Sequence, residues 1–258
     1  MIRGIYSTVS GMNLQMTRAE TASRNLDNIN LPGYKKDRIE AEPFLRLVQL
    51  SAGMMDNSTH QYKRSALGIT NQGAEVQELS TDFSVGDPRE TGNKTDFALQ
   101  GPGFFTLSDP ENEANIYYTR NGSFHLDQAG YLVNANGLRV MGEGGPVQLE
   151  GPDSFEVDAN GNITENGTLN DSISIVTFEN LDNLVGVGNN LYQAPDQGTQ
   201  PVENPGLNQG FLEAANVESA DEMTNLVTAV RAYETGQKII QTQDNMLDMA
   251  INKVGTIR

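Results

Sequence analysis

The sequence of 258 residues contains no cysteine, no tryptophan and only two histidines. Without cysteine the chain has no disulfide bond, zinc–cysteine centre or thiol nucleophile. His60 and His125 are too few for a histidine-based metal centre with its supporting hydrogen bonds. The sequence also lacks any run of about 18 apolar residues, so we expect no transmembrane helix and no direct insertion into a membrane.

Basic residues are scarce as well, because 17 Lys and Arg stand against 34 Asp and Glu and give a formal net charge of −17. A nucleic-acid binder needs a basic surface, so we exclude nucleic acid as a partner. The charge is unevenly spread, with net charges of +3 over residues 1–64, −18 over 65–215 and −2 over 216–258. The two ends of the chain therefore differ in kind from its centre.

The N-terminal segment 2–26 carries an apolar stripe that advances alternately by three and four residues. This alternation is the seam of a coiled coil and predicts a long amphipathic helix. Pro32 and Gly33 end the pattern, because a residue before proline disfavours helix and glycine allows the chain to turn. The segment lacks a continuous apolar stretch and carries Arg18 and Arg24, so we do not expect a cleaved secretory signal.

A second stripe with the same alternation runs through the C-terminal segment 223–254. Ser219 followed three residues later by Glu222 is a capping box, which predicts the start of this helix. Gln237 and Asp244 interrupt the stripe, and polar residues in a seam cost stability but can fix its register. We expect the helix to run almost to the end of the chain.

One copy of the chain offers too little cover for these stripes. Burying an apolar side chain contributes about 1.5–3 kcal/mol, whereas ordering one helix of this length costs on the order of 25–50 kcal/mol of backbone entropy. A pair of helices still leaves half of its surface in water, and the acidic centre offers no large apolar acceptor. We therefore predict an assembly interface between copies, formed by Ile5, Val9, Met12, Met16, Leu26, Leu226, Val230, Tyr233, Ile240, Leu247, Ile251 and Val254.

Between residues 96 and 178 the pattern changes to period two, with turn residues between short runs. Asn121-Gly122 predicts a hairpin between 116–120 and 123–126, because Asn-Gly is the strongest short hairpin signal. Further turns are predicted at Asp127–Gly130, Asn136-Gly137 and Asn160-Gly161, and a buried strand is predicted over Ile173–Phe178. Many short strands with closely spaced turns are typical of a β-barrel or a sandwich-like domain.

The region before the strands is harder to interpret. Phe44 to Leu50 is compatible with a helix, and 51–70 has no regular pattern. We predict an α+β fold in which a β-rich central barrel or sandwich-like domain is flanked by N- and C-terminal amphipathic coiled-coil helices. The predicted parts are an N-terminal helix over 1–31, an extended or irregular connection over 32–95, a β-rich domain over 96–215 and a C-terminal helix over 216–258.

No pattern in the sequence predicts catalysis or a cofactor. Asp158-x-Asn160-x-Asn162 is similar to the opening of a calcium loop, but Ile163 replaces the required glycine and Leu169 the required glutamate, so we prefer a hairpin turn. Gly186-x-Gly188 lacks the third glycine of a dinucleotide-binding loop, and no Gly-x-Ser-x-Gly elbow occurs. We therefore predict that the protein is not an enzyme and has no cofactor and no metal site.

Four separated stretches resemble the rod and hook proteins of the bacterial flagellum. The run from Asn25 to Lys35 is similar to the N-terminal signature of that family, and 231–247 is similar to its C-terminal signature. In the centre, 99–105 and 118–124 are also similar to the rod proteins. The matching residues of the N-terminal signature are Asn25, Leu26, Asn28, Gly33, Tyr34 and Lys35.

The resemblance implies a structural axial subunit of the basal-body rod, proximal or distal, that transmits torque for motility. It further implies export through the flagellar type III apparatus without a cleaved signal peptide, and assembly at the growing tip with terminal helices inside and the β-rich domain outside. Implied partners are copies of the chain, neighbouring rod and hook proteins and the export apparatus, within the basal body of the cell envelope. The alternative is a secreted β-rich module that binds a glycan or a host surface and is oligomerised by its helices.

Overall fold

A computed structural model describes residues 2–43, 46–51, 65–71, 73–112, 115–151, 155–165, 167–194, 198–202 and 204–254 of the chain. It divides into two compact units, which are described separately. Unit 1 comprises Met1–Arg24, Asp37–Ser80 and Ala220–Arg258, and unit 2 comprises Asn25–Lys36 and Thr81–Ser219. The chain is α+β, with a helix near each end and mostly β-strands between them, which confirms the predicted class at this level.

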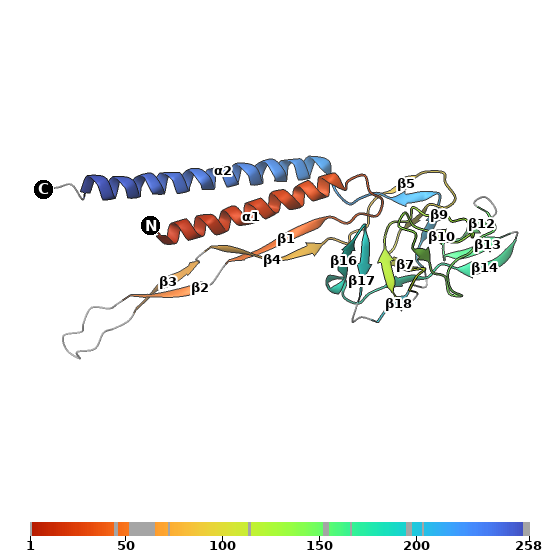
Figure 1. Ribbon diagram of the computed structural model, residues 1–258. Coiled ribbons are helices and arrows are strands. Elements are labelled where there is room, and N and C mark those ends of the chain that lie inside the picture. Colours follow the sequence, from red (N-terminus) through yellow and green to blue (C-terminus); the bar gives the residue numbers. More distant parts are fainter. Residues whose placement is uncertain are drawn as a thin grey trace. The chain divides into compact units, whose positions relative to one another are not determined.

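The two predicted terminal helices are present as α1 (Ile2–Asp27) and α2 (Ser219–Met249). α2 begins at Ser219, the residue that the capping box indicates. Asp221 and Glu222 lie in its first turn, where their negative charges stabilise the positive end of the helix dipole. A π-helical segment, η2 (Ala250–Val254), continues the chain after α2. In unit 1 the two helices lie side by side (Figure 1).

Two ribbons of paired strands belong to unit 1. β1 (Asp37–Pro43) pairs with β4 (Ala74–Thr81), and β2 (Arg46–Ser51) pairs in antiparallel fashion with β3 (Ser65–Asn71). The amide of Ala74 donates a hydrogen bond to Ser10 Oγ at 3.3 Å, which joins the start of β4 to α1.

The expected helix over Phe44–Leu50 is wrong, because residues 46–50 form strand β2. Its hydrogen-bond partner is β3, with Val48 opposite Ile69, so pairing with a distant segment overrides the local pattern. β3 also gives regular structure to the end of the stretch 51–70, whose residues 52–64 lie outside the described residues.

The centre of unit 2 is a nine-stranded sheet in the order β16-β17-β8-β7-β11-β10-β9, to which β15 is joined through β7 and β18 through β15. Its described ends, β16 and β9, do not pair with each other, so the sheet is open, and of the two predicted alternatives, barrel or sandwich-like domain, the closed barrel is not formed. The strands are β7 (Phe104–Ser108), β8 (Ile116–Thr119), β9 (His125–Leu126), β10 (Leu132–Val133), β11 (Arg139–Val140), β15 (Ile175–Thr177), β16 (Val185–Gly188), β17 (Leu191–Gln193) and β18 (Gln200–Pro201).

Three smaller sheets complete unit 2. β12 (Phe155–Val157), β13 (Asn162–Glu165) and β14 (Thr168–Ser172) form one, followed by the short 3₁₀ helix η1 (Leu181–Asn183). The other two join the beginning of the unit to its end: β6 (Phe97–Leu99) pairs with β19 (Leu207–Gln209), and β5 (Pro88–Glu90) pairs with β20 (Phe211–Glu213).

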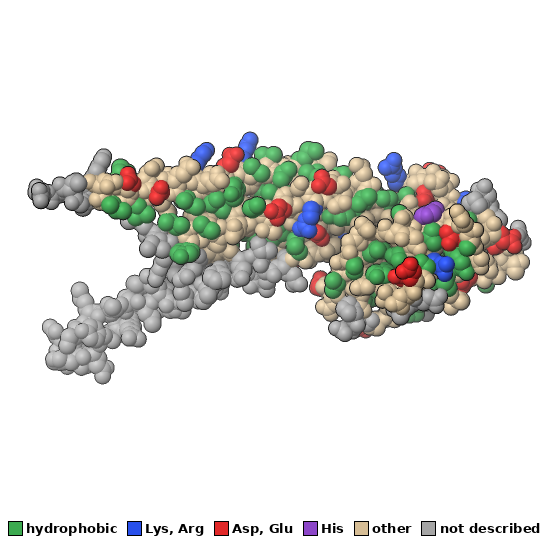
Figure 2. Space-filling model, in the orientation of Figure 1, with side chains coloured by type: hydrophobic (Ala, Val, Ile, Leu, Met, Phe, Trp, Pro, Cys, Tyr) green, Lys and Arg blue, Asp and Glu red, His purple; other side chains and the backbone are tan. Residues whose placement is uncertain are grey.

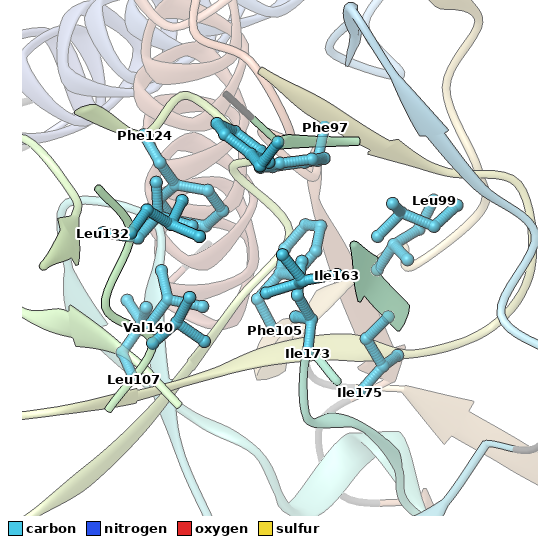
Figure 3. Close-up of a cluster of buried hydrophobic side chains, with 14 of the residues drawn as sticks. Phe97, Leu99, Phe105, Leu107, Phe124, Leu132, Val140, Ile163, Ile173 and Ile175 are labelled. Carbon is cyan, nitrogen blue, oxygen red and sulfur yellow. The ribbon is translucent and has the colours of Figure 1, made fainter. Parts of the chain in front are cut away.

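The core of unit 2 is built on β7, which is buried on both faces. Phe105 and Leu107 point into a large apolar cluster that also contains Phe97 and Ile163 (Figure 3). Phe104, on the opposite face of the strand, makes edge-to-face contacts with Phe178 and Tyr192 in a second cluster, where Tyr118 makes the same kind of contact with Phe178. The alternation of a strand thus supplies two clusters from one short run.

Three of the four predicted turns connect paired strands. Residues 127–131 join β9 to β10, 134–138 join β10 to β11, and 158–161 join β12 to β13. Gly130, Gly137 and Gly161 have positive φ angles of 83°, 81° and 91°, which glycine adopts without strain. The buried strand expected over Ile173–Phe178 is present as β15.

The hairpin expected at Asn121-Gly122 is wrong, because β8 pairs with β7 and β17 whereas β9 pairs with β10. Gly122 instead lies against β6, where its carbonyl accepts a hydrogen bond from the amide of Phe97 at 3.0 Å. A Cβ atom on Gly122 would lie 1.7 Å from the carbonyl oxygen of Phe97. The glycine is therefore needed for close approach of two segments and does not form a tight turn.

Candidate assembly interface

The helices α1 and α2 run antiparallel, since Gly4 faces Gln243 and Met12 faces Gly236. A Cβ atom on Gly236 would lie 2.5 Å from Met12 Cγ, and one on Gly4 would lie 3.1 Å from Gln243 Nε2. Glycine at these positions allows the two helices to approach closely. The apolar pairing of the two chain ends is therefore achieved within a single copy.

The less exposed residues of α2 form two rows along its inner face, and only one of these rows consists of residues predicted for the stripe. The half-buried residues Leu226, Tyr233, Ile240 and Leu247 were all predicted for the stripe. The second row is formed by Ala229, Gly236 and Gln243, each one residue before the predicted Val230, Gln237 and Asp244. Small side chains on this row permit the close contact with α1, and a search for small residues at heptad spacing would have found Ala229 and Gly236.

The buried face of α1 differs from the predicted stripe. Its buried residues are Leu14, Thr21, Ala22 and Asn25, whereas the predicted Ile5, Met12 and Leu26 are half-buried. α1 contacts α2 through Met12 and the start of β4 through Ser10. Around the helix axis, its most buried positions lie on the face between these two residues.

Apolar side chains remain exposed on the outer faces of both helices (Figure 2). Of the predicted interface, Val9 and Met16 are 41% and 52% exposed, and Val230 and Ile251 are 42% and 70% exposed. The side chain of Val254 lies outside the described residues. Large exposed apolar side chains also occur at Tyr6, Met223, Val227, Ile239, Met246 and Met249. Four of the predicted interface residues are thus exposed in a single copy.

The signature residues near the end of α1 lie in unit 2, where they form its first contacts. Asn25 is buried and accepts a hydrogen bond from Tyr34 Oη at 3.1 Å, and Leu26 and Asn28 are half-buried. Gly33 has a φ angle of 66° and its amide donates to the carbonyl of Glu213 at 2.8 Å. The N-terminal signature is thus attached to the C-terminal end of the unit.

Lys35 completes the signature and lies in a buried cluster of charges. Its Nζ contacts Glu213 Oε1 at 2.5 Å and donates to the Ser84 carbonyl at 2.6 Å. Glu213 Oε2 lies 3.5 Å from Nη1 of Arg120, and Oε1 accepts from the amide of Gly86 at 2.8 Å. The Arg120 guanidinium also lies 5.2 Å from the centre of the Phe104 ring. We call Lys35, Arg120 and Glu213 the ion triad.

Asn216 provides a second link between the same segments. Its Oδ1 accepts from the amide of Lys36 at 2.8 Å, and its Nδ2 donates to the carbonyl of Asp82 at 2.7 Å and to Ser84 Oγ at 3.0 Å. The chain therefore enters unit 2 beside the point where it leaves, and buried charge and backbone hydrogen bonds hold both segments.

The ion triad predicts an unusual pH dependence. Burial lowers the pKa of Lys35 below 10.5, with nearby Arg120 acting in the same direction and Glu213 and Asp82 opposing it. Between the two pKa values of Lys35 the unfolded chain binds more protons than the folded chain, so stability is expected to rise with pH by up to about 1.4 kcal/mol per pH unit.

Urea unfolding of the wild type and of Lys35→Met between about pH 8 and pH 11 measures this effect. Burial raises the pKa of Tyr118, which lowers stability with rising pH above its usual pKa in both proteins. Subtracting the free energy of unfolding of Lys35→Met from that of wild type removes the contribution of Tyr118. We expect this difference to increase as pH rises, because wild type becomes more stable relative to the variant. A difference that stays constant with pH would contradict the lowered pKa of Lys35.

The described residues provide neither a metal cluster nor a membrane span. In this part of the chain, His, Asp and Glu do not gather into a group of three or more that suits a metal ion. None of the described helices combines the length and hydrophobicity that a membrane span requires. Asp158 Oδ1 accepts hydrogen bonds from the amides of Asn160 and Asn162 at 2.9 and 3.0 Å, which confirms a turn at the calcium-loop-like sequence.

Comparison with known proteins identifies two family models along the chain. Residues 98–170 match the flagellar hook protein FlgE/F/G D1 domain, and residues 208–253 match the flagellar basal body rod FlgEFG protein C-terminal region. The second match begins within β19 and includes Glu213, Asn216 and the whole of α2. The matched ranges thus contain two members of the ion triad, Arg120 and Glu213.

Whole-length relatives agree with these models. The chain is 32% identical to the flagellar basal-body rod protein FlgG of Bacillus subtilis (strain 168), over 98% of this chain and 99% of the relative. It is also 32% identical to FlgG of Buchnera aphidicola subsp. Schizaphis graminum, over 96% and 98%, and to FlgG of Borreliella burgdorferi, over 98% of both. The chain therefore belongs to the flagellar hook–basal body rod protein family and is a structural rod subunit of the basal body, not an enzyme.

Proposed function

We propose that this chain is exported through the flagellar type III apparatus and polymerises through its terminal helices into an open-ended rod that transmits torque. The observation that carries the proposal is the exposure of Val9, Met16, Val230 and Ile251 on the outer faces of two helices that already cover each other's inner faces. Within one copy these side chains remain 41–70% exposed. Neighbouring copies would provide it by extending the helix pair into a coiled-coil assembly.

The geometry of such an assembly follows from the contacts available. The inner residues, including Met12, Leu226 and Tyr233, hold α1 and α2 together, and the outer residues contact the helices of neighbouring copies. A contact between two different surfaces that does not close into a ring produces an open helical filament. In this arrangement the terminal helices, 1–31 and 216–258, form the axial part and the β-rich domain over 96–215 lies outside.

Composition supports the export step. The chain is only 37% hydrophobic and contains no cysteine. Low hydrophobicity favours an unfolded chain before export, and a chain without cysteine crosses an oxidising compartment without forming disulfides. In this proposal the N-terminal segment stays attached after export, because α1 is required for assembly.

Sedimentation velocity at rising concentration tests the proposal against a secreted binding module. An open-ended polymer gives monomer at low concentration and a continuous series of larger species as the concentration increases. A module joined by a closed coiled coil gives one fixed dimer or trimer that does not grow further. Growth without a limiting size supports the rod proposal, and a fixed oligomer contradicts it.

A further inference from the structure

The Glu213 carboxylate lies between two buried cations that come from distant parts of the chain. Lys35 precedes it by 178 residues and Arg120 by 93 residues. All three side chains are almost fully buried. One carboxylate thus compensates a charge from the N-terminal segment and a charge from the central sheet at the same time.

The charge count makes this carboxylate indispensable. With both cations protonated, the ion triad has a net charge of +1, and loss of the Glu213 charge raises it to +2. Among the described residues, Arg120 Nε is buried without a hydrogen-bond partner, so the guanidinium has no spare acceptor at that atom. Removing one partner of a buried ion pair leaves an uncompensated charge, which costs much more than the pair itself contributes.

Backbone contacts connect the ion triad to both segments. The carbonyl of Glu213 accepts from the Gly33 amide, and the side chain of Asn216 accepts from the Lys36 amide. Strand β20, which ends at Glu213, pairs with β5. Packing of residues 33–36 therefore depends on residues 211–216 through charge and through hydrogen bonds.

We propose that Glu213 is a conformational lock, which couples packing of the N-terminal segment 33–36 to packing of the C-terminal segment 211–216. Neither segment packs stably against the rest of unit 2 unless the other segment is also packed there. This inference concerns folding within one copy and holds whether or not the chain polymerises. If the proposed export is correct, unit 2 closes only after its C-terminal end has been delivered.

The test compares Glu213→Gln with Glu90→Gln in the full-length protein. Glu90 is exposed on β5, opposite Phe211 of β20. Glu90→Gln therefore makes the same chemical change beside β20 but removes an exposed charge and leaves the buried charges unchanged. Amide hydrogen exchange is measured at Gly33 and Lys36. We expect exchange at both amides to accelerate at least about 100-fold in Glu213→Gln and to stay within about threefold of wild type in Glu90→Gln.

A double variant keeps the test decisive if Glu213→Gln does not fold. Lys35→Met/Glu213→Gln returns the net charge of the ion triad to +1, so we expect at least about tenfold recovery of protection, or regained folding by circular dichroism. Lys35→Met alone leaves Glu213 paired with Arg120 and should keep protection within about tenfold of wild type. Wild-type protection in Glu213→Gln, or no recovery in the double variant, would overturn the lock.

Discussion

Replacing Gly33 with alanine is expected to destabilise unit 2 by at least about 4 kcal/mol, a loss that few single substitutions cause. The added Cβ would lie 2.4 Å from the carbonyl carbon and 2.5 Å from the carbonyl oxygen of Arg120. It would also lie 2.6 Å from the amide nitrogen of Asn121. These atoms are all backbone, and the ion triad and the bond from Gly33 to Glu213 hold both sides of the contact.

Gly137→Ala is a matched control for this prediction. Gly137 also has a positive φ angle, 81° against 66° for Gly33, but in the described part of the chain no atom outside its chain neighbours lies within 4 Å of an added Cβ. Its substitution is therefore expected to cost only the strain of the left-handed conformation, about 1–2 kcal/mol. Urea unfolding of both variants measures the difference, and equal losses would show that the approach of Gly33 to Arg120 is not tight.

The terminal helices were predictable because their signals are local. The step of three and four residues, the capping box at Ser219 and the Pro32-Gly33 stop each act within a few residues, and α1 and α2 follow them closely. The inner faces were less predictable, since they depend on which neighbour each helix meets. Gly236, for example, is buried against Met12 and Thr8 of α1.

The contacts of unit 2 depend on pairing across long distances, which local patterns do not reveal. Asn121-Gly122 carries a hairpin signal, yet the backbone of Gly122 is hydrogen-bonded to β6, and the preceding Arg120 lies beside Glu213. Glu213 was missed for the same reason: in sequence it is one acid among 34. The resemblance to rod proteins indicated Lys35 and the stretch around Arg120, but the pairing of β5 with β20 was needed to bring them together.

Replacing Val230 with aspartate is expected to abolish polymer growth while leaving the folded monomer intact. Val230 is 42% exposed on the outer face of α2, so the monomer should lose no more than about 0.5 kcal/mol of stability. In the proposed rod this side chain is covered by a neighbouring copy, and every subunit would then bury an unpaired carboxylate. A penalty of several kcal/mol per contact raises the concentration needed for growth at least about 100-fold.

Val187→Asp supplies the control, because Val187 is a similarly exposed valine, 51%, on strand β16 of unit 2 and lies far from the helices in sequence. Sedimentation velocity of wild type, Val230→Asp and Val187→Asp across the same concentration series is the most direct test of assembly through the terminal helices. We predict open-ended growth of wild type and Val187→Asp and a monomeric Val230→Asp. Undiminished growth of Val230→Asp, or equal loss in both variants, would contradict assembly through the helix faces.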